Sequence, residues 1–369
     1  MRPLKGTFLG LLAIFIAWSA SQFLAGGLFE VYFFNLGVPI EEIYLANALW
    51  FVAGIILVPI ARKMDAKKFM IAASFISILC INILIFPMDY AAIWFRLLYG
   101  LQLVLFWVPF NILYYEHVHK NNAVMGSLYC SIGPFVSLVL PAVSGTVAEF
   151  LGFESLFVLA MGSYAITMVL TWFFASERKF DYTMKNAMKA VSGLKWIIFI
   201  EGFAITSMMS ITMPIMVLSY ISQPIEVGWF LSFVTVFSVA ASFLLSDISD
   251  RNHKRRVFLI VSVAGMGIGC ILTGFSGDLF GFFIGLGIVK FFMAIYSPLG
   301  LALVVDNTKS LIDSMAGREL LLNVGRVSGG LLGLAVLVYS DIATALIVQG
   351  IAIFLYIAAL EMKNGKIKM

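Results

Sequence analysis

The distribution of basic residues along this chain of 369 residues is the feature that most constrains its fold. Twelve apolar stretches are separated by short polar segments, and one threading through a membrane leaves 21 of the 24 lysines and arginines in segments on a single side. Segments on the other side carry acids, among them Glu41, Asp89 and Asp278, and no basic residue. Basic residues concentrate in the cytoplasmic loops of membrane proteins. The pattern predicts a multi-pass plasma-membrane protein with both termini in the cytoplasm.

Each apolar stretch is long enough to form a membrane-spanning helix. A helix needs about 20 residues to cross about 30 Å of hydrocarbon, and it satisfies its own backbone polar groups there. Hydrophobic residues make up 62% of the chain and charged residues 12%, so the lipid bilayer is the expected solvent. The expected spans are residues 7–29, 43–61, 69–87, 90–113, 124–148, 154–175, 196–220, 226–246, 257–276, 279–304, 317–338 and 342–360.

Composition argues against several functional classes. The net charge of +4 lies in short loops, where it indicates topology and not a nucleic-acid partner. The three cysteines fall inside apolar stretches, so neither a disulfide framework nor a metal site is expected. Three histidines, two of them in one loop, do not form a catalytic cluster, and no phosphate-binding loop of Walker type occurs. We therefore expect no enzyme activity and no cofactor.

The chain divides into two similar halves of six spans each. Asp65 and Asp250 are 185 positions apart, and so are Gly100 and Gly285, and 185 is half the length of the chain. A shared offset favours two repeats related by an axis along the membrane normal. The expected units are residues 1–175, a cytoplasmic linker at 176–195, and residues 196–369. Two interpretations of the basic linker are open: it lies along the membrane surface, or it is a solvated connection.

Corresponding loops of the two halves share a motif, in which a small residue is followed by an aspartate and then by basic residues. The motif residues are Ala61, Asp65, Lys67 and Lys68 in the first copy, and Ser246, Asp250, Arg251, Lys254 and Arg255 in the second. The motif resembles the signature G-x-x-x-D-R-x-G-R-R/K of the major facilitator superfamily, and the resemblance extends over the whole chain. It implies that Asp65, Lys67, Asp250, Arg251 and Arg255 hold a cytoplasmic gate shut.

Two further patterns carry this resemblance. Arg96 and Gly100 in the fourth span resemble the family's R-x-x-x-G pattern. Pro141 and Gly145 in the fifth span resemble its G-P-x-x-G-G pattern, and Gly133-Pro134 is a second candidate for the same role. Glycine and proline allow a helix to bend and to pack closely. Leucine and serine replace two glycines of the pattern associated with antiporters, which leaves the direction of transport open.

Lys290 is the sharpest functional candidate. It lies 11 residues from the outer start of the tenth span, which is about 16 Å along a helix and near the membrane midplane. An ammonium at this depth needs a carboxylate, an anionic substrate or a water-filled cavity. Two interpretations are open: contact with the substrate or a coupling ion, and a structural ion pair.

Other polar residues inside the spans form a second set of candidates. Glu319, Asn323 and Arg326 share one stripe of the eleventh span, and they either line a cavity or form a ladder that satisfies itself. Arg96 and Glu30 lie at compatible depths and are expected to pair. Glu201 is interpreted either as a carboxylate that carries a proton or as an interfacial residue. Weaker cavity candidates are Gln22 and Gln102.

The resemblance implies an all-α integral membrane protein with twelve transmembrane helices in two pseudo-symmetric six-helix bundles. It also implies a monomeric secondary active transporter that moves a small molecule by alternating access, coupled to a proton or ion gradient. Buried cations and carboxylates favour a charged or zwitterionic substrate. The alternatives are a multidrug efflux transporter of this fold and a sensor or scaffold that does not transport.

Overall fold

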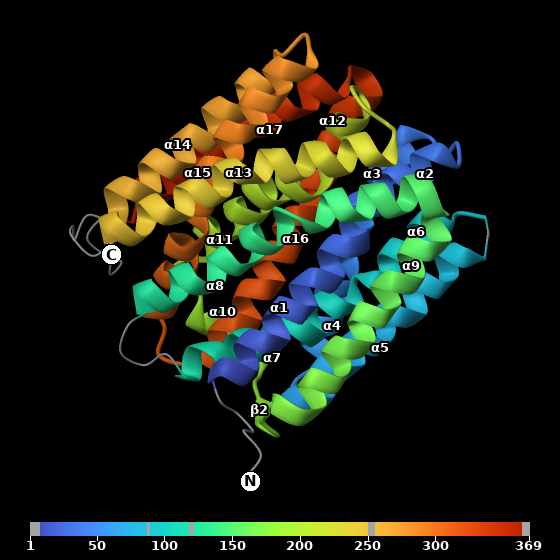
Figure 1. Cartoon of the computed structure of the whole chain (residues 1–369). Helices are drawn as coiled ribbons and strands as arrows, with labels where there is room; N and C mark the ends of the chain where they lie inside the picture. The colour runs from blue at the N-terminus through green and yellow to red at the C-terminus, as the bar shows by residue number, and fades with distance from the viewer. Residues whose placement is uncertain (1–7, 87–88, 118–121, 250–254, 364–369) are drawn as a thin grey trace.

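A computed structural model describes residues 8–86, 89–117, 122–249 and 255–363, and nearly all of them lie in long helices (Figure 1). Eleven helical segments of the described chain are long and apolar enough to cross a membrane. One of them, Tyr129–Phe174, holds two crossings, because Gly152 interrupts it with a left-handed φ of 82°. Glycine adopts this conformation without steric cost. The described residues therefore make twelve crossings, as the sequence predicts.

The first half contains spans one to six, and several of these spans are built from more than one helix. Its elements are α1 (Phe8–Ala25), η1 (Gly26–Leu28), α2 (Phe29–Asn35), α3 (Ile40–Leu49), α4 (Val52–Ile60), β1 (Lys63–Asp65), α5 (Ala66–Ile85), α6 (Ala91–Tyr99), α7 (Leu101–His117), α8 (Asn122–Ser137) and α9 (Leu140–Phe174).

The second half contains spans seven to twelve and follows the linker elements. The linker holds β2 (Lys179–Asp181) and α10 (Met184–Ala190), and the spans are α11 (Lys195–Ile200), η2 (Glu201–Thr206), η3 (Met208–Thr212), α12 (Met213–Leu218), α13 (Pro224–Ser249), α14 (Arg255–Gly274), α15 (Leu279–Asp306), α16 (Leu311–Tyr339) and α17 (Ile342–Glu361). The segments η2 and η3 are π-helical, a form that is rare and often marks a functional site.

The linker is tied to both halves of the protein at one end of the bundle, which we call the linker end. Strand β2 pairs antiparallel with β1, so that Met64 lies opposite Phe180. Helix α10 packs against α16, where Gly317 leaves room for the backbone of Ala187. Tyr182 is buried and donates its hydroxyl to a carbonyl of α4. The linker therefore packs on protein through part of its surface, while its charged residues stay exposed.

Glycines bring the two halves into direct backbone contact. In Figure 1 the blue-to-green first half and the yellow-to-red second half meet along α8, α9 and α13. Gly145 of α9 and Gly228 of α13 face each other there, and a Cβ on Gly145 would lie 3.0 Å from the Cα of Gly228. This contact lies near the start of α13, at the end of the bundle opposite the linker. Small residues allow such close helix contacts in membranes.

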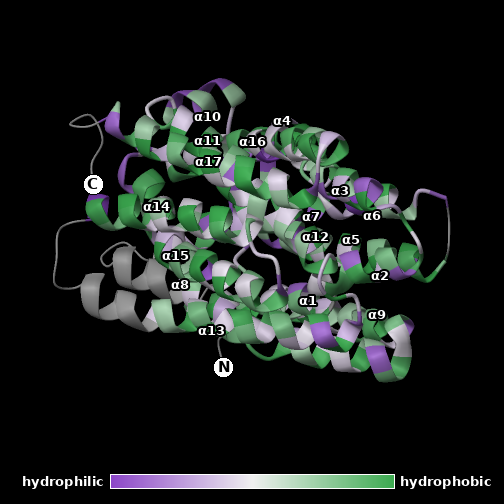
Figure 2. Ribbon diagram, turned by 90° about the horizontal axis from the view of Figure 1, so that it is seen from above, coloured by the Kyte–Doolittle hydropathy of each residue, from purple (hydrophilic) through white to green (hydrophobic). Residues whose placement is uncertain are grey.

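Apolar side chains also cover the outside of the bundle. Large exposed residues include Phe150, Trp172 and Phe275. Figure 2 shows apolar residues along most of the length of the helices, with polar residues gathered toward helix ends and loops. Such a surface is stable in contact with lipid and not with water.

We predict that the N-cap of α17 stabilises the fold in a pH-dependent way. Asp341 accepts a hydrogen bond from the backbone N–H of Thr344 at 2.6 Å, and this bond lowers the carboxyl pKa below 3.8. A carboxyl group with a lower pKa in the folded than in the unfolded protein stabilises the fold at pH values above its unfolded pKa. This stabilisation is lost as the pH falls through the pKa of the folded protein. Asp341→Ala should cost about 1 kcal/mol at neutral pH.

The measurement is thermal unfolding in detergent, for the wild type and the variant, across a pH series. The difference in melting temperature should shrink as the pH falls below 3.8. A difference that stays constant over the series would show that the carboxylate does not act as the cap.

Candidate functional site

A cavity of about 560 Å³ lies between the two halves. Its wall is formed by spans one, two, four and five of the first half and by spans seven, eight and ten of the second. The volume is within the range of sites that bind small molecules. Both halves therefore contribute to the wall of one cavity.

Lys290 of α15 lines this cavity from the second half. Its side chain is half-buried, and it forms no ion pair with the part of the chain that the structure describes. The Ser238 hydroxyl donates to the backbone carbonyl of Lys290 at 3.1 Å, so this contact holds the helix and not the ammonium. The interpretation of Lys290 as half of a structural ion pair is not supported by the described residues. The ammonium instead faces a space in which a ligand or water can approach it.

Glu30 and Arg96 line the same cavity from the first half and form a buried ion pair. The same carboxylate oxygen, Oε1 of Glu30, also accepts a hydrogen bond from Asn47 at 3.0 Å. The guanidinium lies over the rings of Trp50 and Phe29, at 5.0 and 5.2 Å from their centres. Cation–π contacts of this kind stabilise a cation that is removed from water. The structure thus brings together the two residues that the sequence suggested as partners.

Gln22 and Gln102 belong to one polar network behind the cavity wall. Gln22 lines the cavity and donates to Gln102 Oε1 at 3.1 Å and to the Tyr164 hydroxyl at 2.8 Å. Tyr99, which also lines the cavity, is within hydrogen-bond distance of Tyr164 at 2.6 Å. Gln102 is fully buried and does not line the cavity. Its role is to hold Gln22 in position.

Aromatic residues form much of the remaining wall, and sequence reasoning did not identify them. Trp18, Trp50, Trp107, Tyr99 and Phe15 all line the cavity. The chain is 15% aromatic, and most of these rings pack between helices or face lipid. Their spacing in the sequence does not distinguish the cavity positions from the others.

The polar stripe of α16 forms a ladder that satisfies itself and does not line the cavity. Arg326 donates to Asn323 at 2.9 Å, to Glu319 at 3.4 Å and to the Thr206 hydroxyl of η2 at 3.1 Å. Asn323 donates to Glu319 at 3.2 Å. The Arg326 guanidinium also lies 5.0 Å from the ring centre of Phe51 in the first half. The alternative that placed these three residues in the cavity wall is wrong.

Glu201 also lies outside the cavity, in a second buried pair. Its carboxylate accepts a hydrogen bond from Arg318 of α16 at 2.7 Å, and both side chains are largely buried. Glu201 is therefore a buried carboxylate with a cationic partner. Arg318 lies inside α16, which begins at Leu311. Sequence spacing gave no signal for this pair, because its members are 117 positions apart.

The proline and glycine residues of the fifth span surround a break in its helix. Helix α8 ends at Ser137 and α9 begins at Leu140, between the two candidate positions. Gly133, Pro134 and Pro141 line the cavity at this break. Gly145 lies one turn further on, in the contact with α13. The fifth span therefore bends where it passes the cavity.

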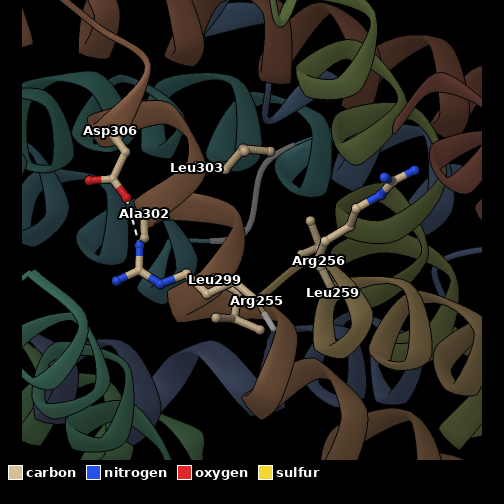
Figure 3. A pocket seen from close by; sticks show the side chains of 7 residues that line it. All are labelled: Arg255, Arg256, Leu259, Leu299, Ala302, Leu303 and Asp306. Carbon is tan, nitrogen blue, oxygen red and sulfur yellow. Dashed lines mark hydrogen bonds and ion pairs between the residues drawn. The ribbon is translucent and has the colours of Figure 1, made fainter. Parts of the chain in front are cut away.

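The described residues of the expected cytoplasmic gate form contacts within one half or with the linker. Asp65 caps α5 by accepting from the Lys68 backbone N–H at 3.3 Å. Lys67 pairs with Glu177 at 3.3 Å. Figure 3 shows Arg255 reaching Asp306, an ion pair of 2.7 Å between α14 and the end of α15.

The space beside Arg255 holds only about 20 Å³, roughly room for one water molecule, and it is not a substrate site. Asp250 and Arg251 lie outside the described residues. The gate stays a prediction.

Comparisons with known proteins agree with this architecture. Residues 196–364 match the family described as Major Facilitator Superfamily. The crystal structure of a POT family transporter in complex with 5-aminolevulinic acid aligns at a TM-score of 0.71, with 13% identity, over 100% of this chain and 99% of that one. The crystal structure of nucleoside transporter NupG aligns at 0.67, with 13% identity, over 96% and 99%. A search of the curated proteins finds no match. The family match covers the second half of the chain, and the likeness to these two transporters shows the same fold over its whole length.

Proposed function

We propose that this protein is a secondary active transporter that moves a small solute across the membrane by alternating access. The observation that carries the proposal is the cavity of about 560 Å³ whose wall is shared by the two halves. A site built from both halves can be exposed to either side when the halves rock against each other.

The contacts between the halves support such a motion. At the end opposite the linker, the halves meet through the glycine contact of Gly145 and Gly228. There Tyr44 and Thr212 also form a hydrogen bond of 2.6 Å between the halves. These two contacts are a backbone approach of glycines and a hydrogen bond between uncharged groups, so separating them costs less than opening a buried salt bridge. We propose that this end opens when the solute enters or leaves.

Charged residues of the cavity indicate how the solute and a driving ion are held. Lys290 is proposed to contact the solute or its coupling ion, because its charge has no described partner. Glu30 is proposed as the carboxylate that takes up a proton, because it lines the same cavity. Arg96 and Gln22 complete this polar wall. Coupling to a proton or ion gradient is proposed from the resemblance to the Major Facilitator Superfamily.

The orientation is proposed from the loops. Basic residues of the linker and of the β1 region lie at the linker end, which the positive-inside rule places in the cytoplasm. Both termini are then cytoplasmic, in a plasma membrane.

We predict that the native Cys130 reports alternating access. Cys130 lines the cavity, whereas Cys80 and Cys270 are fully buried. In membrane vesicles of each orientation, a membrane-impermeant maleimide should label Cys130 from both sides. This result follows if the cavity opens to each side in turn. Cys130→Ala is the control and should abolish labelling.

Labelling of Cys130 in vesicles of one orientation and not of the other would contradict alternating access. It would favour a protein that binds a ligand without moving it, such as a sensor. The experiment does not require the identity of the solute.

We predict that Lys290 and Arg326 respond differently to alanine substitution. Lys290→Ala removes a cation without a described partner, so solute binding should fall while the melting temperature stays near the wild-type value. Arg326→Ala leaves Glu319 buried without its cation, which should cost about 3–5 kcal/mol of stability. Ligand binding and thermal unfolding of the purified variants measure both effects. A large loss of stability in Lys290→Ala, or none in Arg326→Ala, would refute this division of roles.

A further inference from the structure

We propose that the solute is an organic monoanion, with a carboxylate or similar head and an apolar, ring-containing body. This inference rests on the proposed transport function and assigns the chemical class of the substrate. It follows from the charge of the cavity wall and from the apolar residues that make up the rest of it.

The charges of the wall sum to one positive charge. Among the described residues that line the cavity, the charged side chains are Glu30, Arg96 and Lys290. Glu30 and Arg96 neutralise each other in a direct ion pair. Lys290 is then the uncompensated charge of this wall. A cation near the membrane midplane is stabilised by an anion, so a ligand with one negative charge makes the site neutral.

Lys290 faces the cavity from the second half and attracts an anionic head group there. In the first half, the guanidinium of Arg96 is paired with Glu30 and lies 5.0 Å from the ring centre of Trp50. The head group of an anion is therefore expected beside Lys290.

The other ligand charges fit this wall less well. A cation is repelled by Lys290. A zwitterion needs a carboxylate for its ammonium, but the carboxylate that the described wall offers, that of Glu30, is already paired with Arg96. The guanidinium beside it also repels a second cation.

Apolar and aromatic side chains make up most of the remaining wall. Phe15, Trp107, Met209, Met213 and Leu286 line it from both halves. Rings and thioethers of this kind bind apolar bodies, and methionine adapts its shape to them. The body of the solute is thus expected to be apolar and to contain a ring.

The test compares four compounds that share a phenylpropyl body and differ in charge: hydrocinnamate, phenylalanine, phenylpropylamine and phenylpropanol. Their binding to the purified full-length protein is measured by titration calorimetry. The proteins are the wild type, Lys290→Gln, Lys290→Arg and Lys309→Gln. Lys309 is an exposed lysine outside the cavity and serves as the matched control.

We expect hydrocinnamate to bind the wild type and Lys309→Gln most tightly of the four. Lys290→Gln should weaken its binding by about tenfold or more, since a buried charge pair is lost, and Lys290→Arg should retain most of the affinity. Tighter binding of any other compound, no binding of hydrocinnamate, or equal affinity in Lys290→Gln would overturn the assignment.

These results separate the substrate class from transport itself. Two-sided labelling of Cys130 without hydrocinnamate binding would leave the transport proposal standing and refute the monoanion. Labelling of Cys130 from one side only, together with hydrocinnamate binding that depends on Lys290, would refute transport and leave the monoanion assignment standing.

Discussion

A charge inside hydrocarbon is stable only beside an opposite charge, strong polar partners or water, and this constraint organises the interior of the protein. Glu30 pairs with Arg96, Glu201 with Arg318 and Glu319 with Arg326, and each of the first two pairs connects different spans. Lys290 has no such described partner and faces the cavity instead. The cost of an unpaired charge therefore distinguishes these three ion pairs from Lys290, whose charge is available to a ligand.

Close backbone contacts complement these pairs by placing the helices. Gly202 and Gly325 bring span seven against span eleven, while Gly145 and Gly228 bring the two halves together. Spans that line the cavity are also irregular: span five is broken at residues 138–139, and span seven contains the π-helical segments η2 and η3. Backbone groups released by such breaks are tolerated in a membrane where they face protein or a cavity. Firm packing and local irregularity thus occur side by side around the site.

The sequence predicted the crossings and the depth of the charged residues because both depend on local properties. Span lengths follow from hydrocarbon thickness, and the two crossings that share α9 were separated correctly at the turn that contains Gly152. The sequence missed Arg318 because a basic residue near a span boundary resembles a loop residue. It also missed the aromatic wall, since rings that line a cavity and rings that face lipid have the same composition and spacing.

The amino-acid sequence alone determined that the chain is a twelve-span helical membrane protein, because apolar length and loop charge act one segment at a time. The tertiary structure alone decided which polar residues share a site. Lys290 and Arg326 both lie near mid-depth on neighbouring spans, but rotation of the helices about their axes turns Lys290 into the cavity and Arg326 into a ladder with Glu319. That rotation depends on packing between helices far apart in the sequence, such as α16 against η2, so no single segment specifies it.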